Sequence, residues 1–486
     1  MRKEEDKPWF DTTKCFIGNK WVASESGEQL DLINPSDGSL ICQIARGTKP
    51  DVDRAVAAAQ QALNGTWGKC SAVERGRILQ RIGTLILTRI DVLARLEAID
   101  VGKPMAQARA DVLAMARYME FYGGAADKIH GSTIPYQDGY TVYTLREPHG
   151  VTGHIIPWNY PMQIIGRSIG AALAMGNACV LKPAEEACLT ALAFADIARE
   201  AGLPDGALNI IPGLGEEAGS ALSKHPAVRH ISFTGSVGVG KIIQHCAAEN
   251  IVPVTLELGG KSPQLVFEDA DIDAAMPFLV NAGIQNAGQT CSASSRILVH
   301  KNVHAEVLDK MAQRYQSLRV GAALGDPDVG PLISARQQAL VNNYLAMGQD
   351  LELAAQGIQS DDTPDGGFYV LPTLFNSVAP EHTLAQQEIF GPVQVIIPFD
   401  DEDHAANIAN GTDFGLVASI WTDSGARQMR LARRLRAGQV FINNYGAGGG
   451  VELPFGGVAM SGHGREKGFE ALYGFSSLKT VAAKHG

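Results

Sequence analysis

Two short segments of the sequence carry side chains that could perform covalent chemistry on a carbonyl group. Cys291 ends residues 288–291 (GQTC), and Glu257 begins residues 257–261 (ELGGK). A thiol adds readily to a carbonyl carbon, and a carboxylate can then activate the water that releases the acyl group. A lone cysteine is more often an inert buried side chain, so it is the pairing with Glu257 that favours a catalytic role. The two segments together predict covalent catalysis at sulfur with a free acid as the product.

Two further polar residues stand where strands are expected to end. Asn159, in residues 157–161 (PWNYP), offers a neutral amide donor that could stabilise a developing oxyanion. Glu185, in residues 182–185 (KPAE), could accept hydrogen bonds from a ribose diol and repel a 2′-phosphate. The simpler alternatives are a turn residue for Asn159 and a solvated surface side chain for Glu185.

A glycine-rich segment, residues 233–240 (FTGSVGVG), occupies a predicted strand-to-helix turn. Backbone N–H groups and the helix dipole at such a turn favour a pyrophosphate. The order of the glycines differs from the usual GxGxxG, so spacing alone is as consistent with a simple turn as with a dinucleotide site. Its position in an alternating series of strands and helices favours the dinucleotide site.

From Val151 onward, β-like runs alternate with helical ones, and Pro161, Gly202 and Pro204 mark helix ends. This βαβ series predicts a parallel sheet wrapped by helices, with ligands beyond the carboxyl ends of its strands. Upstream, residues 51–117 read as two or three amphipathic packing helices.

Residues 141–145 (TVYTL) read as an isolated edge strand, and a second such strand is expected near residues 477–481. An edge strand without a local partner often pairs with another subunit, so we expect an oligomer.

Composition excludes several classes of protein. The chain has 486 residues, 45% of them hydrophobic, and this length predicts two or more domains. No apolar run is long enough to cross a bilayer and no signal segment begins the sequence, so we expect a cytoplasmic protein. The seven cysteines form no CxxC pair, which disfavours a disulfide framework or structural zinc site, and a net charge of −11 disfavours nucleic-acid binding.

Assembled in order, these segments resemble the NAD(P)-dependent aldehyde dehydrogenase superfamily, of the non-acylating, hydrolytic type, over nearly the whole chain. The resemblance rests on motifs that agree in order and spacing: PWNYP (157–161), KPAE (182–185), FTGS (233–236), LELGGK (256–261), GQTC (288–291), EIFGPV (388–393) and PFGG (454–457).

The resemblance implies an α/β fold with two Rossmann-like doubly wound domains and a β arm for oligomerisation. It assigns residues 1–124 and 149–257 to an NAD-binding domain and residues 258–470 to a catalytic domain. Residues 125–148 and 471–486 would form the arm, and the assembly would be a homodimer or homotetramer.

The resemblance also implies roles for individual residues. Cys291 would be the nucleophile, Glu257 the general base, and the Asn159 amide with the Cys291 N–H the oxyanion hole, while Glu466 would relay protons to Glu257. The cofactor would contact Ile156, Trp158, Lys182, Glu185, Phe233, Gly235, Ser236, Val239, Leu258, Glu388 and Phe390. The substrate tunnel would be lined by Tyr160, Ile164, Arg167, Gln285, Leu453 and Phe455, beside a loop from Tyr445 to Leu453. No metal is required.

Arg167 is the residue that bears on whether the substrate carries a carboxylate. Many relatives have a large apolar residue here, whereas succinic-semialdehyde enzymes have an arginine that pairs with the substrate carboxylate. The second arginine of those enzymes, six residues before their cysteine, is Gln285 in this chain. A single arginine can equally form a structural ion pair, so aliphatic or aromatic aldehydes and carboxylate-bearing semialdehydes both stay open.

The implied reaction is NAD-dependent oxidation of an aldehyde to the acid through a Cys291 thiohemiacetal and thioester, with water activated by Glu257. One alternative is a CoA-acylating aldehyde dehydrogenase, against which Glu257 argues. Another alternative is a thiol esterase or a catalytically inactive structural homologue. The cofactor residues argue against both, because neither kind of protein needs them. Glu185 favours NAD over NADP.

Overall fold

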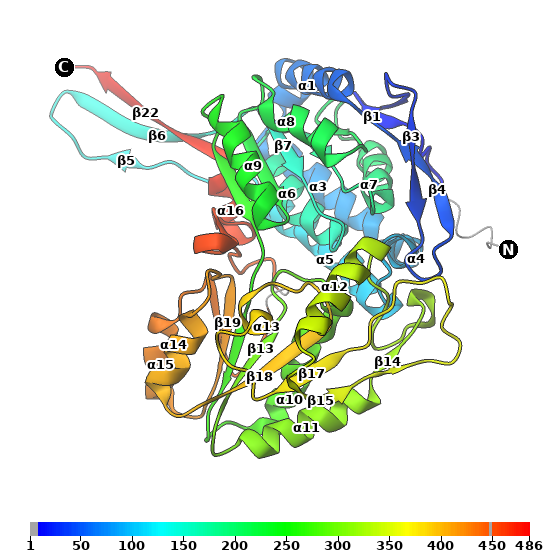
Figure 1. Cartoon of the computed structure of the whole chain (residues 1–486). Helices are drawn as coiled ribbons and strands as arrows, with labels where there is room; N and C mark the ends of the chain where they lie inside the picture. The colour runs from blue at the N-terminus through cyan, green and yellow to red at the C-terminus, as the bar shows by residue number, and fades with distance from the viewer. Residues whose placement is uncertain (1–7, 447–449) are drawn as a thin grey trace.

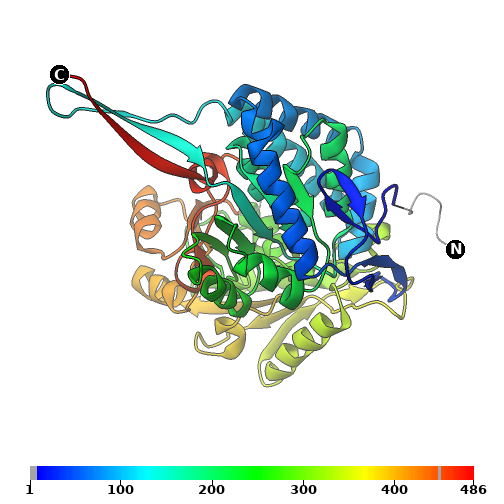
Figure 2. The same cartoon turned by 90° about the horizontal axis from the view of Figure 1, so that it is seen from above.

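The computed structural model describes residues 8–446 and 450–486. Two sheets with their covering helices lie one above the other, and a narrow β arm projects away from both (Figure 1). The view from above shows the same arm standing clear of the body (Figure 2). This arrangement confirms the predicted α/β architecture of two doubly wound units with a β arm.

The first sheet has the order β2-β1-β9-β8-β7-β10-β11-β21 in the described part of the chain. Its strands from β9 to β11 are parallel, whereas β1 and β21 pair with their neighbours in the antiparallel sense. The strands are β1 Cys15–Ile17, β2 Lys20–Val22, β7 Val151–Ile155, β8 Ala178–Lys182, β9 Leu208–Ile210, β10 His230–Thr234, β11 Val254–Glu257 and β21 Gly462–His463.

The second sheet has the order β15-β17-β18-β13-β12-β19-β20, parallel except for the antiparallel pair β15–β17. Its strands are β12 Pro263–Val266, β13 Arg296–His300, β15 Glu352–Gln356, β17 Thr373–Asn376, β18 Val393–Phe399, β19 Val417–Trp421 and β20 Gln439–Ile442. Two small sheets lie beside the main ones: β3 Gln29–Ile33 with β4 Leu40–Ala45, and β14 Arg319–Val320 with β16 Ile358–Gln359.

Helices cover both sheets. Those of the first unit are α1 Lys49–Asn64, α2 Thr66–Lys69, α3 Ala72–Leu87, α4 Ile90–Val101, α5 Met105–Ala125, α6 Pro161–Ala174, α7 Leu189–Glu200, α8 Ser220–Lys224, α9 Val237–Ala248 and α16 Gly468–Gly474. Those of the second are α10 Ile272–Ile284, α11 His304–Ser317, α12 Ala335–Met347, α13 Thr383–Gln386, α14 Glu402–Asn410 and α15 Gly425–Arg434. Single turns of other helix types span Gly215–Gly219, Gln285–Gly288, Ala323–Gly325 and Ala459–Ser461.

The expectation of two or three helices in residues 51–117 is too low, because α1 to α5 fall in or across this range. Two local signals divide the pattern. Ser71 accepts a hydrogen bond from the Glu74 N–H and starts α3 with a capping box, and Gly102 ends α4 at φ +82° just before Pro104. The apolar periodicity continues across Ser71 and Gly102, so it does not show that the helices are interrupted there.

The arm also corrects one expectation. Residues 141–145 do not form an isolated strand, because β6 Tyr140–Pro148 lies between β5 Thr133–Ile134 and β22 Ser476–Lys484 of the same chain. The pairing with β22 could not be predicted from the local sequence, because β22 is more than three hundred residues away from β6 along the chain. The strand expected near residues 477–481 is confirmed as β22.

The segment after β20 returns to the first unit. Strand β21 pairs with β11, and residues of α16 such as Ala471 and Leu472 pack in the same hydrophobic core as α6. The range 258–470, predicted to form the catalytic domain, therefore contributes a strand to the first sheet. This return brings residues 455–467 beside the carboxyl end of β11.

Candidate active site

A cavity opens where the strand order of the first sheet reverses. Strand β7 has β8 on one side and β10 on the other, and such a switch point leaves a crevice beyond the carboxyl ends of the strands. The loop after β7 leads into α6 at Pro161, a residue suited to the first helical turn. The cavity encloses about 690 Å³, and its walls come from both units.

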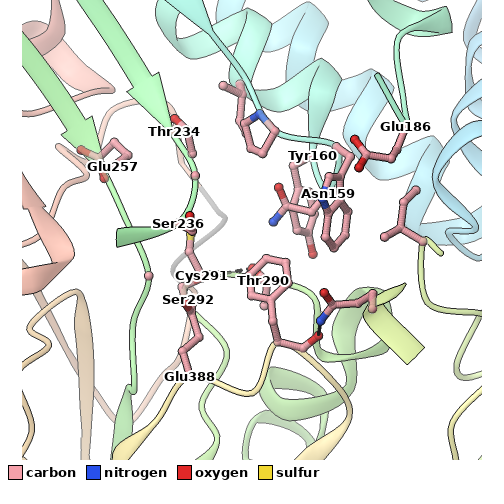
Figure 3. A pocket seen from close by; sticks show the side chains of 18 of the residues that line it. Asn159, Tyr160, Glu186, Thr234, Ser236, Glu257, Thr290, Cys291, Ser292 and Glu388 are labelled. Atoms are coloured by element: carbon pink, nitrogen blue, oxygen red, sulfur yellow. Dashed lines mark hydrogen bonds between the residues drawn. The ribbon is translucent and has the colours of Figure 1, made fainter. Parts of the chain in front are cut away.

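Thirteen of the predicted site residues line this cavity. They are Trp158, Asn159, Tyr160, Ile164, Arg167, Gly235, Ser236, Glu257, Gln285, Cys291, Glu388, Phe390 and Phe455. Figure 3 shows Glu257 and Thr234 at the ends of adjacent strands, Asn159 and Tyr160 on the loop that leads into α6, and Cys291 near the centre of the view. Residues distant in the sequence thus meet in one space.

Cys291 lies on a loop with an unusual backbone. Asn286, Ala287 and Gly288 have φ values of +49°, +55° and +73°, a region that side chains other than glycine rarely adopt. A Cβ on Gly288 would overlap the Gly391 carbonyl group, so this position requires glycine. The loop is held in a conformation that regular secondary structure does not provide.

Side-chain amides hold the loop in place. The Gln289 amide donates to the Asn286 carbonyl oxygen at 3.0 Å, and the Ile333 N–H donates to Gln289 Oε1 at 2.9 Å. The Asn286 amide donates to the Asn159 carbonyl oxygen at 3.0 Å, while Asn159 Nδ2 donates to the Gln289 carbonyl oxygen at 2.9 Å. Asn159 therefore belongs to the network that positions Cys291.

Burial raises the pKa of the Cys291 thiol to about 12. The positive charge of Arg167 opposes this effect, whereas Glu388 and Glu257 add to it. The thiol therefore keeps its proton at neutral pH in this state.

Glu257 is the last residue of β11 and is only 1% exposed. Burial raises the pKa of its carboxyl well above the ordinary value, and Glu466 contributes in the same direction against Arg167. A Cβ on Gly456 would lie 2.7 Å from Glu257 Oε1, so the absence of a side chain lets that segment approach the carboxyl.

Arg167 and Glu466 form a buried ion pair. Glu466 also accepts a hydrogen bond from Ser232 Oγ at 2.9 Å, and Arg167 Nη2 donates to Thr234 Oγ1 at 3.3 Å. The guanidinium carbon lies 5.2 Å from the centre of the Phe455 ring. The ion pair favours the alternative in which Arg167 binds an internal carboxylate.

Tyr160 is supported from behind by a buried charged cluster. Lys103 Nζ lies 3.9 Å from the centre of the Tyr160 ring, donates to Glu97 at 3.0 Å and pairs with Asp111. The Asp111 carboxylate also accepts a hydrogen bond from Gln163, another residue of the cavity wall. The cluster fixes one wall of the cavity.

The opposite part of the cavity presents Glu388 and the start of α9. The Gly260 N–H donates to Glu388 Oε1 at 3.1 Å, and burial raises the pKa of Glu388 to about 7. Ser236 caps α9 by accepting a hydrogen bond from the Val239 N–H. The Phe390 ring meets Trp158 edge-on, with ring centres 5.3 Å apart.

The remaining predicted residues lie outside this lining. Glu185 pairs with Lys182 at 2.6 Å and lines a neighbouring cavity of about 450 Å³, which shares Glu186 and Arg336 with the main one. Ile156, Phe233, Leu258 and Glu466 are buried, whereas Val239 and Leu453 are 44% and 45% exposed. Of the loop predicted to flank the tunnel, residues 447–449 lie outside the described residues.

Several cavity residues were missed in the sequence: Gln163, Glu186, Ser292, Ile333, Arg336, Gln337, Asn343 and Lys467. Glu186 and Lys467 directly follow predicted residues, so their neighbours could have indicated them. Gln337 on α12 donates to the Phe390 carbonyl oxygen at 2.8 Å, a long-range contact with no signal in the sequence.

Within residues 8–446 and 450–486, no group of three or more His, Cys, Asp or Glu side chains could hold a metal ion. None of the helices in the described part of the chain is long and apolar enough to cross a membrane.

Comparison with known proteins identifies the family. A model of the aldehyde dehydrogenase family matches residues 21–481. A crystal structure from Burkholderia cenocepacia, assigned as an aldehyde dehydrogenase, superposes with a TM-score of 0.97 and 61% identity over 97% of this chain and 100% of that chain. The NAD⁺ complex of an aldehyde dehydrogenase from Bacillus cereus superposes with a TM-score of 0.95 and 38% sequence identity, over 98% of this chain and 97% of that chain. The hydroxyisobutyraldehyde dehydrogenase of Mycolicibacterium austroafricanum is 40% identical over 469 residues, 96% of this chain and 92% of that protein. The chain therefore belongs to the aldehyde dehydrogenase family, as its motifs indicated.

Proposed function

We propose that this protein oxidises an aldehyde to the carboxylic acid with NAD, using Cys291 as the nucleophile and Glu257 as the general base. The observation that carries the proposal is that both side chains line one cavity between two Rossmann-like units. In the net reaction, aldehyde, water and oxidised cofactor give acid, reduced cofactor and a proton.

The residues around the cavity fit a dinucleotide. Gly235 and Ser236 line it at the start of α9, where the N–H groups and the helix dipole favour a pyrophosphate. A Cβ on Gly259 would overlap the Glu388 carboxylate, so glycine there leaves Glu388 room to accept bonds from a ribose. When bound, the oxidised nicotinamide of NAD supplies the hydride acceptor.

Cys291 Sγ bonds to the aldehyde carbon, and the thiol proton leaves as the carbonyl oxygen gains negative charge. The Asn159 amide and the Cys291 N–H would donate hydrogen bonds to that oxygen. Asn159 Nδ2 donates one hydrogen bond to the Gln289 carbonyl oxygen at 2.9 Å, and its second N–H would donate to the substrate oxygen. Loss of hydride from the same carbon leaves a thioester on Cys291.

Glu257 then removes a proton from water, which attacks the thioester and releases the acid. A raised pKa makes the ionised carboxylate a stronger base than an ordinary glutamate. The presence of this carboxylate base in the cavity supports transfer to water over transfer to CoA. Glu466 would assist as a proton relay, although its bonds to Arg167 and Ser232 must then rearrange.

Glu185 would bind the adenosine ribose and disfavour the 2′-phosphate of NADP. The adjacent Glu186 adds a second carboxyl to the same neighbourhood. Both features support NAD as the preferred cofactor.

The arm would mediate assembly into a homodimer or homotetramer. It extends away from the body (Figure 1) and exposes Tyr136 at 65% and Leu478 at 57%. Deletion of residues 133–145 should shift the mass measured by light scattering toward the monomer, and an unchanged mass would contradict this role.

The proposed reaction is tested by a pre-steady-state assay of NADH formation with NAD and a panel of aldehydes. We expect wild-type protein to release one acid per NADH without added CoA, and Cys291→Ala to lose both the first turnover and the steady state. NADH formation that survives in Cys291→Ala, or product that appears only with CoA, would contradict the proposal.

A further inference from the structure

The Arg167 guanidinium is held by the protein itself at the carboxyl end of the first sheet. Its Nε pairs with the Glu466 carboxylate, and its Nη2 donates to Thr234 Oγ1 at 3.3 Å. The guanidinium carbon lies 5.2 Å from the centre of the Phe455 ring, and the side chain is only 8% exposed. Two of its three nitrogen atoms are thus engaged by neighbouring side chains, so Arg167 presents a positive charge in a fixed position.

This fixed charge lies beside Glu257. Thr234, which accepts the hydrogen bond from Arg167, is the register partner of Glu257 on the adjacent parallel strand (Figure 3). Register partners on adjacent strands point to the same face of a sheet. The ring of Phe455 faces the guanidinium, and a Cβ on the next residue, Gly456, would lie 2.7 Å from Glu257 Oε1. Two separate segments therefore place the Arg167 charge next to the Glu257 carboxyl, and both residues line the cavity.

The Glu257 carboxyl is buried without the bonds that usually stabilise a charge. Both of its oxygen atoms are buried, and within the part of the chain that the structure describes neither has a hydrogen-bond partner. A buried carboxyl of this kind takes up a proton unless a nearby positive charge stabilises the ionised form. Only the ionised form can remove a proton from water. The proposed base therefore needs a cation beside it.

We infer that Arg167 is a positioning residue for thioester hydrolysis, whose fixed charge favours the ionised form of the Glu257 carboxyl. Glu466 orients the guanidinium and partly offsets its charge. The inference rests on the proposed function, because Arg167 acts through the proposed base. In the step concerned, a water proton moves to Glu257 and the water oxygen bonds to the acyl carbon. The carbon–sulfur bond then breaks with its electron pair on Cys291 Sγ.

The ionisable groups around Glu257 agree with this assignment. Burial raises the pKa of Glu257 most, and Glu466 raises it further, whereas Arg167 opposes both more strongly than Arg465 and Lys467 do. Arg465 also donates to two backbone carbonyl oxygens of its own segment. Arg465 and Lys467 are retained in all the variants proposed, so a difference between variants reports on Arg167 and Glu466.

The experiment measures the hydrolysis step by itself. Full-length enzyme is mixed with NAD and with the aldehyde that wild type oxidises at the highest kcat/KM, kept below the enzyme concentration so that each site turns over once. Acid quenching and mass spectrometry then follow the decay of the acyl group on Cys291. Once the thioester has formed, Cys291 has no thiol to titrate, so the pH profile of the decay reports on the base. The decay rate should rise with pH and level off where Glu257 is fully ionised.

Three variants without the Glu466 charge isolate the charge of Arg167. Glu466→Gln keeps the cation, Arg167→Met/Glu466→Gln removes it, and Arg167→Lys/Glu466→Gln keeps a cation of different shape. None of them leaves Glu466 as a buried carboxylate deprived of its partner. Arg427→Met is the control for loss of an ion-paired arginine, because Arg427 pairs with Glu268 and Asp269 outside the cavity lining.

Relative to wild type, Glu466→Gln should move the inflection of the profile to lower pH, because an anion beside Glu257 is lost. Relative to Glu466→Gln, Arg167→Met/Glu466→Gln should move it to higher pH by at least about one pH unit, the effect of one nearby opposite charge on a carboxyl. Arg167→Lys/Glu466→Gln should stay closer to Glu466→Gln, and Arg427→Met should match wild type. Adding Glu257→Gln should abolish the difference, because the titrating carboxyl is then absent.

Slower decay at every pH with an unmoved inflection would indicate a structural or proton-relay role for the pair and would overturn the inference. A shift in the opposite direction, or a difference that persists with Glu257→Gln, would also overturn it. Either result leaves the proposed function intact, whereas absence of NADH formation with every aldehyde would refute the proposed function and this inference with it. The decay is first order, so its rate constant does not depend on how much of a variant is folded.

Discussion

The strand end that carries Glu257 and the loop that carries Cys291 face the same cavity but are built differently. Glu257 ends a regular strand, paired in register with Thr234 on β10. Cys291 follows a run of residues that includes three consecutive positive φ values, held by the side chains of Asn159 and Gln289. Glu257, the proposed general base, is thus placed by the sheet itself, whereas Cys291, the proposed nucleophile, depends on a network of amides from several elements.

The two residues should therefore be sensitive to different kinds of mutation. A change of the Glu257 carboxyl should alter chemistry without moving its backbone, because the ladder of β10 and β11 does not use the side chain. A change in the amide network should move Cys291 even when no reacting atom is removed. Mutations at the two places should therefore produce two distinguishable kinds of loss.

Glu257→Gln should show the largest effect. We expect a burst of NADH from the first turnover to remain while the steady-state rate falls by about a hundredfold or more, because only thioester hydrolysis needs the base. Stopped-flow absorbance resolves the two phases. An equal loss of burst and steady state would remove Glu257 from the hydrolytic step.

Asn159→Ala should lower kcat by about a hundredfold through loss of an oxyanion donor. Because Asn159 also contacts the loop, the rate of Cys291 alkylation by iodoacetamide should be measured in parallel. An altered alkylation rate would assign part of the loss to a displaced nucleophile, and an unchanged rate would assign all of it to the oxyanion. Unchanged kcat would contradict both roles.

The pH dependence of alkylation reports on the loop environment in the absence of cofactor. Since burial raises the pKa of Cys291 to about 12, the thiolate fraction should rise with pH across the neutral range. The alkylation rate should increase roughly tenfold for each pH unit below that pKa. Cys291→Ala controls for labelling of the other cysteines. A plateau near neutral pH would mean that the site lowers this pKa instead.

The smallest change expected is one of stability, for Gly288→Ala. Gly288 has a φ of +73°, and a Cβ at this position would overlap the Gly391 carbonyl group. We therefore expect the free energy of unfolding to fall by about 1–3 kcal/mol. Gly425→Ala is the matched control, because it begins α15 with no atom within 4 Å of the added Cβ. Denaturant titration of both variants gives the comparison, and equal stability would show that the loop tolerates a side chain.

Local patterns were enough to predict the alternating strands and helices that begin at Val151. Strands β7, β8 and β10 are buried along their whole length, and each was predicted as a β-like run in the alternating series. Pro161 and Gly202 carry boundary signals that depend only on backbone chemistry. The motifs at the strand ends followed from this reading, and the family comparison supports it.

Long-range contacts were not predictable in the same way. The pairing of β6 with β22 and the ion pair of Arg167 with Glu466 each join residues about three hundred positions apart. The positive φ values of Asn286 and Ala287 occur at non-glycine residues and leave no mark in the sequence. The contact of Gln337 with the cavity wall is not visible in the sequence either, because Gln337 reaches the Phe390 carbonyl oxygen only in the folded chain.

The pairing of β21 with β11 has a consequence for biosynthesis. Leu256 and Glu257 lie opposite His463 and Gly462, so this edge of the first sheet is closed only after residues 462–463 leave the ribosome. Until then the nascent chain carries an unpaired β edge at β11, a state open to premature association.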